Sequence, residues 1–139
     1  MLARYLENDD LVEQTGHLSE LNGTRYNRQI ALFYADHNRK PEEAFADASR
    51  EYQDRRDIYG ADTLAWTALK ARNLAEAQKA MSETLRLSTR DAKLYYHAGM
   101  VAAACGNLKS SRTYLQRALA LNPGFDPLQA REARRALGQ

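Results

Sequence analysis

Apolar residues return every three or four positions in three separate stretches of the chain. These stretches read EEAFADASREYQDR, AEAQKAMSETLRL and KSSRTYLQRALAL, and such spacing is typical of amphipathic helices. Each follows a short polar break (HNRKP, ARN or CGN), and before each break lies another apolar stretch, IALFYA, LAWTAL or AGMVAA. The pattern therefore predicts three units, each built from a helix, a tight turn and a second helix.

The units recur at a nearly constant interval. The first helices carry a small residue every 34 positions, at Ala31, Ala65 and Gly99. The second helices do so at intervals of 33 and 34, at Ala44, Ala77 and Ser111. A fixed period of this length is the signature of a repeat architecture. We expect the small residues to lie where the two helices of a unit cross closely, because interiors are tightly packed.

Turn residues support the predicted helix limits. Pro41 stands at the start of a second helix, where its missing N–H is harmless. Gly106 and Asn107 are suited to a left-handed helix end, and Pro123 ends the last unit.

These residues resemble the tetratricopeptide repeat, whose pattern is W-x2-L-G-x2-Y, then A-x3-F, then P. The match is best in residues 92–123, where the pattern places are filled by Tyr95, Ala98, Gly99, Ser111, Leu115 and Pro123. The second unit keeps Leu64, Ala65, Ala77 and Met81, with Ala61 in the W place and Thr89 in the proline place. The first unit is more degenerate and keeps Ile30, Ala31, Tyr34, Ala44 and Ala48. Several segments are also similar to the C-terminal repeat region of larger bacterial tetratricopeptide proteins, a resemblance that implies no particular biochemical activity.

The resemblance implies an all-α fold, a right-handed α-α superhelical solenoid of about three helix pairs. The expected units are residues 24–57, 58–91 and 92–125. Residues 1–23 are expected to form an N-terminal helix or half-repeat, and residues 126–139 a capping helix with Asp126 as its cap. In that last helix we expect Leu128, Ala133 and Leu137 to pack and three arginines to face water. A half-repeat would make the chain part of a longer array, or let it form a homo-oligomer through its terminal helices.

In this family the first helix of each pair lines a concave groove that receives a peptide or a partner helix. Transferred position by position, that role falls on Arg25, Arg28, Leu32, Asp36, Tyr59, Asp62, Trp66, Lys70, Lys93, Tyr96 and Met100. Aromatics, a methionine and both signs of charge suit an interface with a buried anchor, and Trp66 is the leading anchor. The alternative is that Trp66 and Tyr96 pack against neighbouring helices, as most helical aromatics do.

Some family members clamp a C-terminal carboxylate on these same helices with lysines, an arginine and two asparagines. Lys93 fits one of those places, and Arg28 could substitute at another. Leu32 and Thr63 occupy the asparagine places and His97 the arginine place. Capture of an acidic chaperone-type tail is therefore not expected.

The charge balance leaves one alternative function open. Twenty basic and eighteen acidic side chains give a net charge of +2, too balanced for a strong phosphate-seeking field. A nucleic-acid-binding helical repeat would have to use local basic faces, at Arg50, Arg55, Arg56 and the C-terminal arginines. We favour a protein-interaction scaffold, because no base-reading aromatic pattern interleaves with the basic residues.

The sequence gives little support for a catalytic site, a metal site or a membrane-spanning segment. His17, His37 and His97 fall in different units without the spacing of metal ligands. No nucleophile has a visible orienting partner, so no enzyme activity and no cofactor are predicted. Cys105 is expected to be a small buried thiol. The longest uncharged apolar run, residues 99–106, is far short of a membrane span. The acidic N-terminus resembles no secretory signal, which favours the cytoplasm, with an excised or processed secreted fragment as the alternative.

Overall fold

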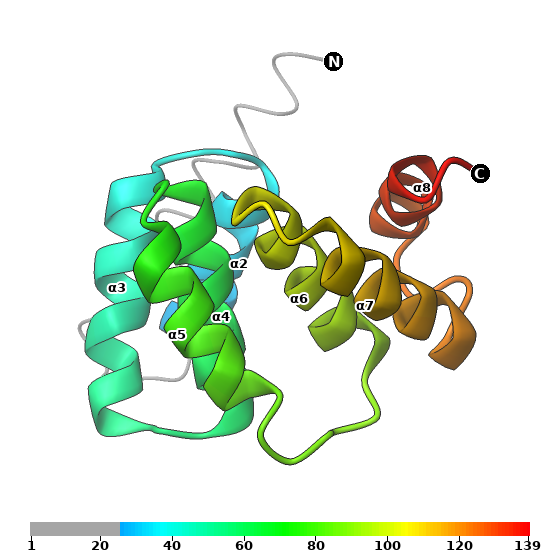
Figure 1. Ribbon diagram of the computed structural model, residues 1–139. Helices are drawn as coiled ribbons and strands as arrows, with labels where there is room; N and C mark the ends of the chain where they lie inside the picture. Colours follow the sequence, from blue (N-terminus) through cyan, green and yellow to red (C-terminus); the bar gives the residue numbers. More distant parts are fainter. Residues whose placement is uncertain (1–25) are drawn as a thin grey trace.

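A computed structural model describes residues 26–139, and every regular element in that range is an α-helix. Three pairs follow one another along the chain, as Figure 1 shows. Their bounds are α2 (Tyr26–Asp36) and α3 (Pro41–Asp54), α4 (Ile58–Lys70) and α5 (Leu74–Thr84), and α6 (Ala92–Ala104) and α7 (Leu108–Leu121). A last helix, α8 (Pro127–Ala136), follows the third pair. The predicted all-α solenoid of helix pairs is confirmed, whereas the expected helix or half-repeat at 1–23 lies outside the described residues, as do Arg25 and His17.

The turns between paired helices use the chemistry that the sequence indicates. Arg72 and Gly106 have φ angles of 62° and 82°, and glycine takes this left-handed region without a steric penalty. The next residue in each case, Asn73 or Asn107, caps the second helix with its side-chain oxygen. Pro41 is the first residue of α3. Each pair is therefore closed by a short turn that starts its second helix at once.

The small residues lie at close helix contacts, as expected. Ala31 and Ala65 are buried in one core cluster with residues of the second helices. A Cβ atom added at Gly99 would come within 2.5 Å of Leu115 Cδ2 on α7. No side chain larger than hydrogen fits there without moving Leu115, so Gly99 sets how closely α6 and α7 approach.

The helix α8 begins as predicted, and two of the three residues expected to pack are buried. The Asp126 carboxylate accepts hydrogen bonds from the backbone N–H groups of Leu128 and Gln129. Ala133 and Leu137 are buried, whereas Leu128 is 63% exposed. The expectation that Leu128 packs is wrong, because position 128 lies roughly 140° around the helix from position 133. The arginines at 131, 134 and 135 are exposed, as predicted.

Candidate partner-binding surface

The first helices of the three pairs lie next to one another, because α2 contacts α4 and α4 contacts α6. We call the face of these helices that carries the predicted groove residues the inner face. Tyr59 is exposed on it, and Asp62, Trp66 and Tyr96 are buried. The partly buried members are Arg28, Leu32, Asp36, Lys70, Lys93 and Met100. The side chains at the centre of the inner face are thus buried, and those at its margins are at least partly accessible to solvent.

Trp66 is enclosed by groups from three helices. Its Nε1 donates a hydrogen bond of 2.8 Å to Asp36 Oδ1 on α2. The His97 ring of α6 stacks on it with centroids 4.2 Å apart, and the Lys70 ammonium lies 4.6 Å from the indole centroid. Only 2% of Trp66 is exposed. In this structure Trp66 packs between helices, which corresponds to the alternative weighed from the sequence.

A buried polar pair links α4 and α6 beneath the indole. His97 Nδ1 lies 2.7 Å from Asp62 Oδ1, and both side chains are inaccessible or nearly so. This contact satisfies Nδ1 of the buried ring, whereas Nε2 has no hydrogen-bond partner among residues 26–139. This pair joins two neighbouring first helices, and neither group faces solvent as a binding residue would.

Tyr96 is the second aromatic of the buried centre. It packs on Phe125 with ring centroids 5.6 Å apart. Burial, followed by the nearby carboxylates of Glu132, Asp36 and Asp126, raises the pKa of Tyr96 from 10.0 to about 12. The phenol therefore stays neutral in the folded chain at pH values where an unfolded tyrosine ionises.

This shift predicts a loss of stability in alkali. Between pH 10 and 12 the unfolded chain releases the Tyr96 proton while the folded chain keeps it, so the free energy of unfolding falls as pH rises. Two pKa units correspond to about 3 kcal/mol. Urea unfolding at several pH values should show that Tyr96→Phe removes this part of the decline. Equal slopes for Tyr96→Phe and the parent chain would contradict the assignment.

Arg28 is held by ion pairs within the chain. Its Nη2 lies 3.1 Å from Glu51 Oε1 on α3 and 3.2 Å from Asp57 Oδ1, the residue that caps α4. The guanidinium thus ties α2 to the turn between α3 and α4. A partner carboxylate would have to compete with both of these acids.

The accessible margin of the inner face lies at the start of α4 and α6. Tyr59 is 47% exposed, and its hydroxyl donates a hydrogen bond of 3.1 Å to Asp91 Oδ2. Burial and this bond raise the pKa of Tyr59. Asp91 also caps α6 by accepting from the Lys93 backbone N–H. At the other end of the two helices, partial burial lowers the pKa of Lys70, an effect that Asp36 opposes.

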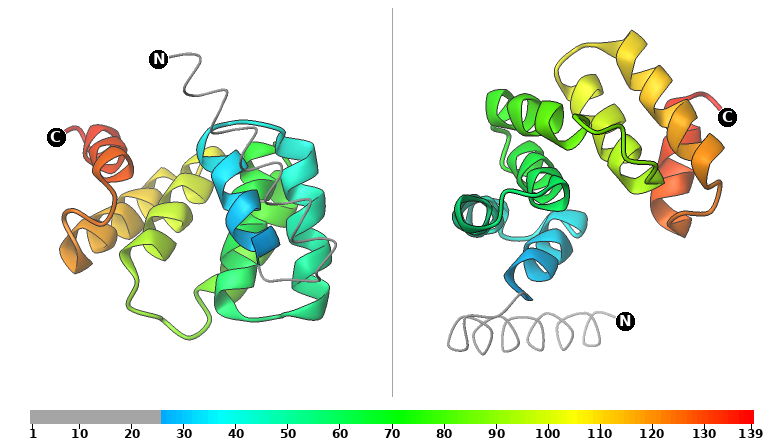
Figure 2. Two further views of the ribbon diagram at one scale, coloured as in Figure 1. Left: turned by 180° about the vertical axis from the view of Figure 1, so that it is seen from behind. Right: turned by 90° about the horizontal axis from the view of Figure 1, so that it is seen from below.

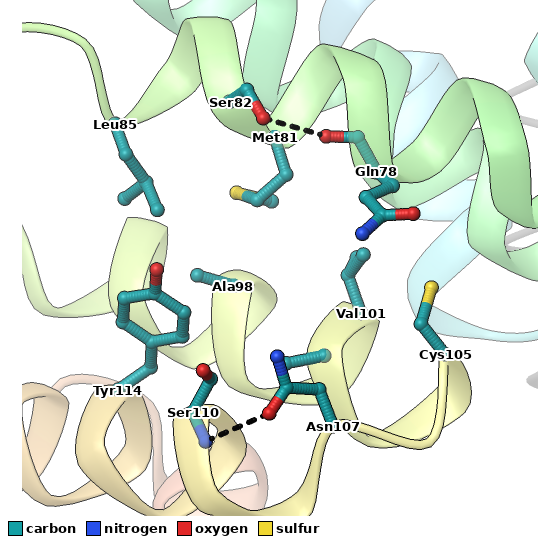
Figure 3. Close-up of a pocket in the computed structure, with 11 residues that line it drawn as sticks. Gln78, Met81, Ser82, Leu85, Ala98, Val101, Cys105, Asn107, Ser110 and Tyr114 are labelled. Atoms are coloured by element: carbon teal, nitrogen blue, oxygen red, sulfur yellow. Dashed lines mark hydrogen bonds between the residues drawn. The ribbon is translucent and has the colours of Figure 1, made fainter.

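A separate groove opens on the opposite side of α6, between α5 and α7 (Figure 3). Its volume is about 360 Å³. Apolar residues and a polar rim line it together: Gln78, Met81, Ser82, Leu85, Ala98, Val101, Ala102, Cys105, Asn107, Ser110 and Tyr114. Cys105 is half-buried at this groove rather than enclosed as expected. We call this hollow the outer groove, and the sequence did not predict it.

The residues expected to contact phosphates do not form one surface. Arg50, Arg55 and Arg56 stand at the end of α3 and just beyond it, and Arg50 pairs with Asp47. The C-terminal arginines project from α8, and the views in Figures 1 and 2 agree that α3 and α8 lie at opposite ends of the described chain. The two basic sets therefore do not form one continuous basic patch.

Comparison with known families identifies the third helix pair. Residues 92–125 match the family model described as the tetratricopeptide repeat. The chain contains a tetratricopeptide repeat. Comparisons with curated proteins and with solved structures found no match. The matched tetratricopeptide segment spans α6, α7 and the turn after them, and it contains Gly99 at the close contact with Leu115.

Tetratricopeptide repeats generally serve as non-enzymatic scaffolds for protein partners. Within residues 26–139 no group of three or more histidine, cysteine and acidic residues is arranged to hold a metal ion. No helix in the same part of the chain is long and apolar enough to cross a membrane.

Proposed function

We propose that this chain is a protein-interaction scaffold that binds a peptide or a partner helix along its inner face. The observation that carries the proposal is the side-by-side placement of α2, α4 and α6 in an array that contains a tetratricopeptide repeat. In such arrays the first helices form the receiving surface. The helices α4 and α6 each carry a row of the predicted groove residues.

The chemistry of the accessible margins indicates the kind of partner. Tyr59 offers a large, half-exposed ring beside Asp91, and the backbone of Lys93 is fixed by the same carboxylate. Lys70 and Met100 are half-buried near the other end of α4 and α6. Partly exposed aromatic and thioether surface next to lysines suits a partner with an apolar anchor and at least one carboxylate.

The proposal is tested with a variant that spares the buried centre. Tyr59→Ala combined with Lys93→Glu should reduce capture of protein partners from a lysate of the source organism at least about tenfold. Helical circular dichroism should be unchanged, because neither side chain is fully buried. The captured partners are compared by mass spectrometry with those of the unmodified chain.

Leu108→Ala with Lys109→Glu is the matched control. These residues also combine one apolar and one cationic side chain, and they are exposed at the start of α7. Loss of capture by this control, with capture retained by the Tyr59 and Lys93 variant, would refute the inner face. Loss of capture only on Ala102→Arg, which fills the outer groove, would place the binding site there instead.

A further inference from the structure

The last helix reaches across the inner face to the first described helix. Gln129 Nε2 on α8 donates a hydrogen bond of 3.1 Å to Asp36 Oδ1 on α2. The same carboxylate oxygen accepts the hydrogen bond from Trp66 Nε1. Asp36 thus joins α2, α4 and α8, and the turn before α8 places Phe125 on Tyr96. Part of the burial at the centre of the inner face comes from α8 and from the segment that leads into it.

The attachment of α8 depends on few and mostly small side chains. Its inward face consists of Gln129, Ala130 and Ala133, continued by Leu137, all of them buried. Only the leucine is a large apolar residue. The helix has ten residues, fewer than the roughly 12 to 15 that an isolated helix needs for stability in water. Figure 1 shows it at the edge of the array, with one connection to α7. Detaching α8 therefore costs little compared with unfolding a helix pair.

We infer that the place where α8 lies is a helix-binding site that α8 occupies within the chain, and that a partner helix with the same inward pattern displaces it. This inference rests on the proposed function and specifies its partner and its regulation. When α8 is displaced, Asp36 and the rings of the inner face become exposed. Binding of the partner helix and release of α8 therefore occur together.

The contacts define which helix fits. Positions equivalent to 130 and 133 require alanine or glycine, because both side chains are at most 1% exposed. The position equivalent to 129 requires a side-chain donor for Asp36, and the position equivalent to 137 an apolar residue. The partner is therefore an amphipathic helix with a donor, two small residues and a leucine-like residue at relative positions 0, 1, 4 and 8, the spacing of one helical face.

A labelled peptide with the sequence of residues 124–139 serves as the probe partner, and fluorescence anisotropy measures its binding to the full chain. In the unmodified chain α8 competes with the peptide and weakens the apparent affinity by the fraction of chains with an empty site. Ala133→Glu puts a charge at a fully buried position and releases α8. The peptide should then bind Ala133→Glu at least about tenfold more tightly than the unmodified chain.

Two controls keep the outcome decisive. Leu128→Glu alters an exposed residue of α8 and should leave peptide affinity unchanged. Gln129→Ala removes the bond to Asp36 without adding a charge and should give a smaller gain; it replaces Ala133→Glu if circular dichroism shows that variant to be unfolded. Equal affinity for the unmodified chain and the release variants, or no binding to any of them, overturns the inference. Because no captured protein is involved, that result leaves the test with Tyr59 and Lys93 unaffected.

Discussion

Replacing Trp66 with alanine should lower the free energy of unfolding by about 3 to 5 kcal/mol, the usual cost of emptying a large aromatic site. The indole is 2% exposed, stacks on His97 and donates a hydrogen bond to Asp36. Alanine leaves a cavity between three helices and an Asp36 carboxylate with one donor fewer. Urea unfolding followed by circular dichroism measures the change.

Tyr59→Ala provides the comparison on the same helix. Its ring is 47% exposed, so its removal should cost less than about 1 kcal/mol. A similar small effect for Trp66→Ala would mean that the indole is not part of the core. A large effect would also mean that loss of partner binding on Trp66→Ala reports unfolding rather than a lost contact.

Replacing Asp62 with alanine should destabilise the chain by about 3 kcal/mol, since it strands a buried ring nitrogen. His97 is fully buried, and its Nδ1 lies 2.7 Å from the Asp62 carboxylate. Its other nitrogen, Nε2, finds no hydrogen-bond partner among residues 26–139. Without Asp62 the imidazole would have no polar contact for either nitrogen. Chemical denaturation of the single variant gives the size of the effect.

The double variant Asp62→Leu with His97→Phe separates the polar pair from its packing. Removing both partners together and keeping apolar volume is often nearly neutral. The double variant should therefore be at least about 1 kcal/mol more stable than Asp62→Ala. If the losses of the single changes simply add, the two groups do not interact as their geometry indicates.

The helices and their turns were predictable because their signals are local. Pro41 at a helix start and the Gly106 turn each act through the nearest few residues, and the 34-residue spacing shows that such local patterns recur along the chain. Close contact at Gly99 was predictable for the same reason, since α6 and α7 are neighbours in sequence.

Exposure on the inner face was harder to predict, because it depends on helices distant in sequence. Nine consecutive residues of α4, Gly60 to Ala68, are buried, since α2, α3, α5 and α6 all contact this helix. The stretch LAWTAL did carry a signal: a helix that is apolar on all sides belongs inside a protein. The position of Trp66 follows from that rule better than from its place in the repeat.

The outer groove had a weaker sequence signal. Ala98 stands 34 residues after Leu64, so the third unit has a methyl group where the second has a larger side chain. Ala102 widens the same side of α6. Whether such space stays open depends on how α5 approaches α7, which no pattern within one helix specifies.

The hydrogen bond between Asp36 and Gln129 joins residues 93 positions apart. In an ordinary repeat array each unit contacts only its neighbours, and melting spreads inward from whichever end is weaker. Here the two ends of the described array are fastened to each other at a single carboxylate. Release of α8 at the carboxyl-terminal end therefore also removes one of the two donors to Asp36 on α2, so a change at one end of the array reaches the other end through this carboxylate.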